Sequence, residues 1–140
     1  MIELRLAPDV LAKIREQEPR FDEGAYLFVL ESIEFLQARL PLRRHVSGPE
    51  LARACRDHAL DQYGLMAGTV LDHWGIRSTE DLGRIVFTLV AVGLLVTQPN
   101  DRESDFDNIF DFVEAFDQGY DWPGLRRQRR RPGGVLEEGV

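Results

Sequence analysis

The spacing of apolar residues along the chain predicts five helices before residue 93. Apolar positions recur at helical intervals over residues 8–18, 24–40, 48–63, 65–74 and 79–92. The clearest pattern is that of residues 24–40, where a broad apolar face runs from Tyr26 to Leu40 and Pro41 ends the helix. Residues 47–50, Ser-Gly-Pro-Glu, have the composition of a capping box and predict the start of the third helix.

The pattern changes after Gly93, where a strand period replaces the helical one. Residues 94–97 are short and β-favouring, residues 99–101 have turn chemistry, and apolar and polar residues alternate over 105–112. We therefore expect a two-stranded hairpin, followed by a helical turn over residues 113–116. The predicted fold class is α+β and mostly α, with about five helices followed by a short C-terminal β-hairpin.

The order of these elements resembles a winged helix-turn-helix over residues 47–112. Residues 70–96, VLDHWGIRSTEDLGRIVFTLVAVGLLV, contain a helix that ends at glycine, an isoleucine in the turn, a capped second helix and a Gly-Leu-Leu entry into a strand. Many proteins that do not bind DNA share this pattern, so the resemblance implies a fold and no function.

Over about residues 10–118 the chain also resembles a family of small bacterial proteins of unknown function. The segments that carry this resemblance are EPRF (18–21), AYLF (25–28), HVSGPEL (45–51), YGLMA (63–67), WGI (74–76), DLGRIVF (81–87) and the stretch 105–116. The resemblance implies no activity, ligand or catalytic residue.

Length and charge divide the chain into a body and a tail. The 140 residues are enough for one core, and we expect a single globular domain over residues 1–120 and a basic, disordered tail over 121–140. Five of the 17 Lys and Arg residues lie within residues 126–131; without residues 126–140, which also hold two of the 24 Asp and Glu residues, the formal charge is −10. Such an acidic body repels nucleic acid and anionic membranes.

The expected location is the cytoplasm. The longest uncharged apolar run, residues 85–96, is too short to span a bilayer, which needs about 20 residues. The first residues lack the pattern of a signal peptide, and a single cysteine fits a reducing compartment.

Sequence-specific DNA recognition is disfavoured by the helix that would perform it. The polar stripe of residues 79–92 is narrow, and its N-terminal end carries Glu80 and Asp81, which repel phosphates. Non-specific contact with nucleic acid or the ribosome is the alternative function, and the tail would make it through five arginines: Arg126, Arg127, Arg129, Arg130 and Arg131.

No combination of residues indicates catalysis, a metal or another cofactor. Zinc sites usually contain a pair of closely spaced ligands, which this sequence lacks. Cys55 has apolar neighbours at helical spacing, as a buried thiol does. A small hydrolase or transferase would need a cleft that joins Cys55, His58 and an acid such as Asp61 or Asp72, so we expect no enzyme.

Aromatic and acidic residues interleave near the end of the body. The aromatic residues are Phe106, Phe110, Phe112, Phe116, Tyr120 and Trp122. They either cover the edge of the core, with the carboxylates facing water, or anchor a protein partner inside an acidic rim. The leading functional hypothesis is a non-enzymatic cytoplasmic module that uses this surface to bind an unidentified protein or itself.

Overall fold

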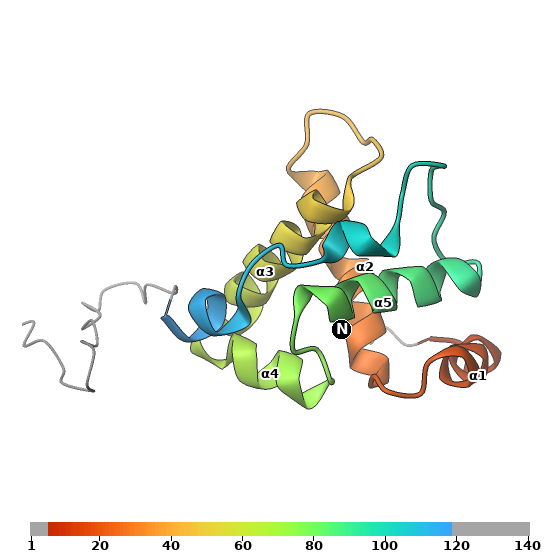
Figure 1. The fold of residues 1–140 in the computed structure, drawn as a ribbon, viewed down its shortest axis with the longest axis horizontal. Helices are drawn as coiled ribbons and strands as arrows, with labels where there is room; N and C mark the ends of the chain where they lie inside the picture. The colour runs from red at the N-terminus through yellow and green to blue at the C-terminus, as the bar shows by residue number, and fades with distance from the viewer. Residues whose placement is uncertain (1–5, 119–140) are drawn as a thin grey trace, which may run out of the picture.

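A computed structural model describes residues 6–118 of the chain, and Figure 1 shows their arrangement. Five α-helices follow one another over these residues: α1 (Pro8–Gln17), α2 (Glu23–Ala38), α3 (Gly48–Tyr63), α4 (Ala67–His73) and α5 (Thr79–Ala91). Three single turns complete the secondary structure, namely the 3₁₀ turns η1 (Gly64–Met66) and η2 (Glu103–Phe106) and the π-helical turn η3 (Val113–Gln118). The sequence predicted all five helices to within two residues of these bounds.

The helices pack around α2, which contacts both α3 and α5. Helix α4 follows α3 closely through η1, and α1 packs against α5 on the other side of the molecule. The side chains of Tyr26, Phe28 and Val29 from α2 are almost fully buried between these helices, together with Leu82, Ile85 and Leu89 of α5. The apolar faces predicted from helical spacing therefore form a single core.

The N-termini of three helices are capped by side chains that the sequence places there. Ser47 accepts a hydrogen bond from the amide of Glu50, and the Glu50 carboxylate accepts one from the amide of Ser47, which confirms the predicted capping box. Asp22 caps α2 and Ser78 caps α5 in the simpler way.

The turn η2 packs closely against two helices at positions where each has a glycine. A β-carbon on Gly83 of α5 would lie 2.9 Å from Cβ of Phe106, and one on Gly48 of α3 would lie 3.0 Å from Cβ of Asp105. Both distances are shorter than ordinary van der Waals contact, so the absence of side chains allows this approach. The Phe106 ring is thereby buried, with 3% of its surface exposed.

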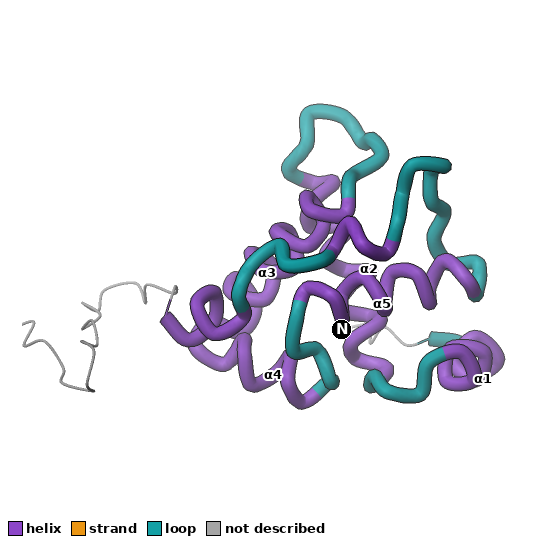
Figure 2. The backbone as a smooth tube through the Cα atoms, viewed as in Figure 1, coloured by secondary structure: helices purple, strands orange, loops and turns teal. Residues whose placement is uncertain are grey.

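The expected β-hairpin is wrong, and so is the α+β class: residues 6–118 contain no strand and the described fold is all-helical. Figure 2 shows residues 92–102 as a loop. Aspartate carboxylates redirect the backbone there, because Asp101, Asp105 and Asp111 each accept a hydrogen bond from an amide three residues away in the same segment. Such local bonds replace those of a strand ladder.

The described residues therefore contain no wing of the kind that a winged helix-turn-helix has. For the helices of residues 47–112 the resemblance to that fold stays a prediction. The final helical turn is confirmed as η3, which begins at Val113 as expected. The proposed domain end at residue 120 and the tail over 121–140 lie outside the described residues.

Replacing Gly83 by alanine tests the close packing of η2. Alanine favours a helix over glycine by about 1 kcal/mol. We nevertheless expect Gly83→Ala to lower the free energy of unfolding by about 1–3 kcal/mol, because its β-carbon overlaps Phe106 and the Glu103 carbonyl oxygen, 3.1 Å away. Urea unfolding followed by circular dichroism measures the change.

A double-mutant cycle with Phe106→Ala is the control for this prediction. The Gly83→Ala cost should shrink in part in the Phe106→Ala background, because the contact with the ring atom Cδ1 at 3.1 Å is gone, whereas the contacts with the β-carbon of residue 106 and with the Glu103 carbonyl oxygen remain. A stabilised Gly83→Ala protein would mean that η2 does not pack on α5 as described.

Candidate functional site

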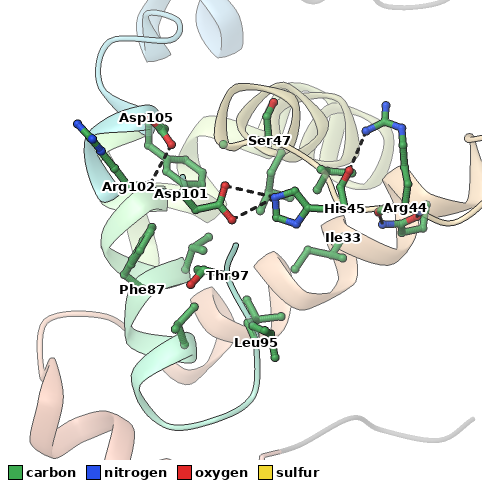
Figure 3. A pocket seen from close by; sticks show the side chains of 18 residues that line it. Ile33, Arg44, His45, Ser47, Phe87, Leu95, Thr97, Asp101, Arg102 and Asp105 are labelled. Carbon is green, nitrogen blue, oxygen red and sulfur yellow. Dashed lines mark hydrogen bonds and ion pairs between the residues drawn. The ribbon is translucent and has the colours of Figure 1, made fainter. Parts of the chain in front are cut away.

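A half-open pocket lies where two loops meet at one end of the molecule. Residues 39–47, here called the His45 loop, join α2 to α3, and residues 92–102, the Asp101 loop, join α5 to η2. The pocket has a volume of about 160 Å³. Figure 3 shows His45 and Asp101 facing each other at its mouth. Its apolar lining consists of Ile33, Val46, Leu51, Val86, Phe87, Val90, Leu95, Val96 and Phe106.

The His45 loop is fixed to α2 by the side chain of Gln37. The Gln37 amide nitrogen donates to the carbonyl oxygen of Arg44 at 2.6 Å, and the Gln37 oxygen accepts from the backbone amide of Arg44 at 3.2 Å. Gln37 is itself buried, with 9% of its surface exposed. Its amide therefore satisfies both backbone groups of Arg44, much as a neighbouring strand would.

A second set of contacts ties the same loop to the start of α3. The Arg44 guanidinium forms a two-pronged ion pair with Glu50, with N–O distances of 3.1 and 2.7 Å, and also donates to the carbonyl oxygen of His45. The hydrogen bond from Arg44 and the one from the backbone of Ser47 lower the pKa of Glu50 to about 2. The carboxylate is therefore ionised over the whole physiological pH range.

His45 and Asp101 connect the two loops across the pocket mouth. The His45 Nε2 atom lies 3.1 Å from one Asp101 oxygen and 3.2 Å from the other. The backbone amide of Gln98 also donates to Asp101, at 2.8 Å, and so orients the carboxylate. Because an ionised carboxylate only accepts hydrogen bonds, this contact assigns the proton to Nε2.

The structure buries part of the predicted aromatic surface. Phe106 and Phe116 are each 3% exposed, so their rings cover the core and are not surface anchors in this conformation. Phe110 and Phe112 are partly buried and stack on each other, with ring centroids 5.4 Å apart. Partner binding by these residues stays a prediction, and Tyr120, Trp122 and the five tail arginines lie outside the described residues.

Two residues of the hydrolase alternative, Cys55 and His58, are buried in α3. Cys55 is 2% exposed, and burial raises the pKa of its thiol to about 12. The His58 ring stacks on Phe28 and lies 4.8 Å from the Phe35 ring centroid. Its Nδ1 atom is buried without a hydrogen-bond partner among the described residues. Neither side chain lines the pocket.

No pattern in the sequence predicts a role for the residues that build the pocket mouth. His45 lies between two predicted helices, and no pattern in the sequence predicts a role for it or for Gln37. Pairing between His45 and Asp101 joins residues 56 positions apart, for which no spacing pattern exists. The capping box was the one local signal near the site.

Comparisons of the chain with protein-family models, characterised proteins and solved structures find no match. In the part of the chain that the structure describes, no three or more His, Cys, Asp or Glu side chains are placed to hold a metal ion. No helix among the same residues is long and apolar enough to cross a membrane.

We expect Cys55 to be unreactive in the folded protein. The raised pKa keeps the thiol protonated, so little of the reactive thiolate is present. Burial also prevents a thiol reagent from reaching the sulfur atom. Native protein should release colour from Ellman's reagent at least about 100-fold more slowly than protein in urea. Since Cys55 is the single cysteine, the whole signal comes from it. Comparable rates would restore the hypothesis of a nucleophilic cysteine.

We also expect His58 to make folding sensitive to acid. Desolvation is the main cause that lowers the pKa of His58 below 6.5 in the folded protein, so the fold favours the neutral ring. Stability from this residue is therefore present above pH 6.5 and is lost as the pH falls through the lower folded-state pKa.

Urea unfolding between pH 7.5 and pH 5 measures this loss. The His58→Phe variant, which keeps an aromatic ring in the stack, should lose less stability over that range than the original chain. Identical pH slopes for the two proteins would contradict the assignment.

Proposed function

We propose that the protein is a non-enzymatic, cytoplasmic interaction module that binds a protein partner through the face around the pocket. The observation that carries this proposal is an apolar pocket whose two loops are each held by their own hydrogen bonds. Preorganised concave sites with few polar groups are typical of binding sites. Their loops are already ordered, so association costs little conformational entropy.

The polar groups at the mouth favour binding over catalysis. In hydrolase triads the acid orients the histidine through one ring nitrogen, and a nucleophile bonds to the other. Here the His45 ring has Asp101 as its single hydrogen-bond partner among the described residues. The nearby Ser47 hydroxyl is used as a helix cap and accepts from the amide of Glu50.

The face around the pocket also exposes apolar surface. Val96 is 89% exposed at the pocket edge, and Leu42 of the His45 loop is 81% exposed. Apolar side chains beside a pocket are a common property of protein-binding surfaces, where a buried centre is surrounded by a polar rim.

The alternative function, contact with nucleic acid or the ribosome, depends on the arginines of residues 126–131. This alternative predicts that partners are retained by the tail, whereas the interaction module predicts that they are retained by residues outside it. The body contributes repulsion to any polyanion, because it carries a formal charge of −10 outside residues 126–140.

Capture of partners from lysate separates the two functions. The baits are the full chain, a chain ending at Gly124 and a full-length variant with all five tail arginines replaced by glutamine, each with and without nuclease. We expect partners that all three baits retain and that nuclease does not remove. The glutamine variant controls for the loss of tail length.

Two outcomes would overturn the proposal. Partners lost with the arginines or with nuclease would indicate a nucleic-acid-associated protein. A monomer in light scattering that captures no partner under mild conditions would leave no interaction to explain.

A further inference from the structure

We propose that the pocket receives one apolar side chain of an extended, basic segment of a partner protein. This inference rests on the proposed function and adds the chemistry of the partner. Three independent features carry it: the size and lining of the pocket, the free backbone at its edge, and the charge of the surface that leads away from it.

The pocket fits a single bulky apolar side chain. Its volume of about 160 Å³ is close to that of cavities that hold one benzene molecule, about 150 Å³. Three of the polar side chains that line it are already engaged, because His45 and Asp101 pair with each other and Ser47 caps α3. An apolar occupant therefore leaves none of these groups unpaired, whereas a polar one has to break a contact to be satisfied.

The backbone at the pocket edge is free to pair with an extended chain. Val96 and Thr97 line the pocket, and neither amide donates a hydrogen bond to a described residue. Both residues lie outside helices and turns. An extended peptide can bond to such an edge through its main chain while an alternate side chain enters the pocket.

The surface beyond the pocket attracts positive charge. Six acidic residues, here called the acidic strip, follow the chain from the pocket mouth to η3: Asp101, Glu103, Asp105, Asp107, Asp111 and Glu114. Within residues 101–114 Arg102 is the one basic residue. Two further arginines lie against the strip: Arg84, 3.9 Å from Glu103, and Arg56, beside Asp111 and Glu114. Asp107, Asp111 and Glu114 are exposed and form no ion pair with a described residue. Basic residues beside the apolar anchor complement this strip.

A randomised heptapeptide library selected on the full chain tests the proposal. We expect enriched peptides that carry one Leu, Ile, Met or Phe at a fixed position and Lys or Arg beside it. Alanine at the anchor position should weaken binding about 10- to 100-fold, which is the value of one buried apolar side chain. Affinity should also fall as salt rises, because the flanking contacts are exposed ion pairs.

Matched variants locate the site. Val90→Phe fills the pocket and should abolish binding, whereas Ala91→Phe adds the same ring to an exposed neighbour outside the pocket and should not. Val96→Lys is a second pocket variant that does not depend on repacking, because Val96 is 89% exposed. On the strip, Asp111→Lys should weaken binding several-fold, while Glu16→Lys on α1 should have no effect.

The main-chain contact has its own test. Since neighbouring amides of an extended segment point in opposite directions, one of Val96→Pro and Thr97→Pro should weaken binding and the other should not. Equal effects of both would contradict pairing with an extended peptide.

The inference fails if selection yields no enriched peptide, if the enriched peptides are acidic, or if Val90→Phe and Val96→Lys bind them normally. Its failure is distinguishable from failure of the proposed function. Lysate partners that Val96→Lys retains would keep the interaction module and exclude this pocket. Saturable binding of small aromatic fragments without any peptide binding would indicate a small-molecule site instead.

Discussion

The arrangement of the pocket end depends on the close approach of η2 to α3 and α5. Glycine in the middle of α5 costs about 1 kcal/mol in helix propensity relative to alanine. Gly83 lets the backbone of Glu103 and the side chain of Phe106 pack directly against the backbone of α5. Burial of a phenylalanine ring contributes about 1.5–3 kcal/mol to stability, and the Phe106 ring is buried. The packing gain therefore exceeds the cost, and a residue that weakens its own helix stabilises the fold.

The position of η2 determines the path of the preceding loop. Residues 92–102 must return from the end of α5 to η2, and this return carries Asp101 to within 3.1 Å of His45. Gln37 and Glu50 hold the opposite loop from the other side, through Arg44. Each loop is thus held by hydrogen bonds of its own, apart from the contact across the mouth. The hydrogen bond between His45 and Asp101 across the mouth bridges two loops that are already in place.

The helices could be predicted from the sequence because their signals are local. Apolar spacing and the capping residues near Ser47 depend only on residues a few positions apart, so they can be interpreted before the fold is known. The alternation of Phe106, Phe110 and Phe112 was equally visible, yet it predicted a hairpin that does not form. Aspartate side chains satisfy the nearby amides, and Phe106 is buried by helices distant in sequence.

The candidate site could not be predicted either, because its contacts join residues that are far apart in the sequence. A linker histidine and a turn aspartate have no periodic relation, and their pairing follows from the position of η2. The buried amide of Gln37 resembles any polar residue at the end of a helix until its two bonds to Arg44 are seen. Sequence reasoning did identify the acidic character of residues 101–114, because charge is a property of composition. It assigned the anchors to this chain, whereas the burial of Phe106 and Phe116 favours anchors supplied by the partner.

Charge alone cannot give such a surface its specificity. The acidic strip attracts any polycation, and the five arginines of residues 126–131 belong to the same chain, where tethering gives them a high effective concentration. A basic partner that offered only charge would have to compete with them at every encounter. An apolar side chain that fits a preformed pocket adds free energy that salt does not screen. In the proposed mode of binding, the strip would govern how fast a partner arrives, and the pocket would govern which partner stays bound.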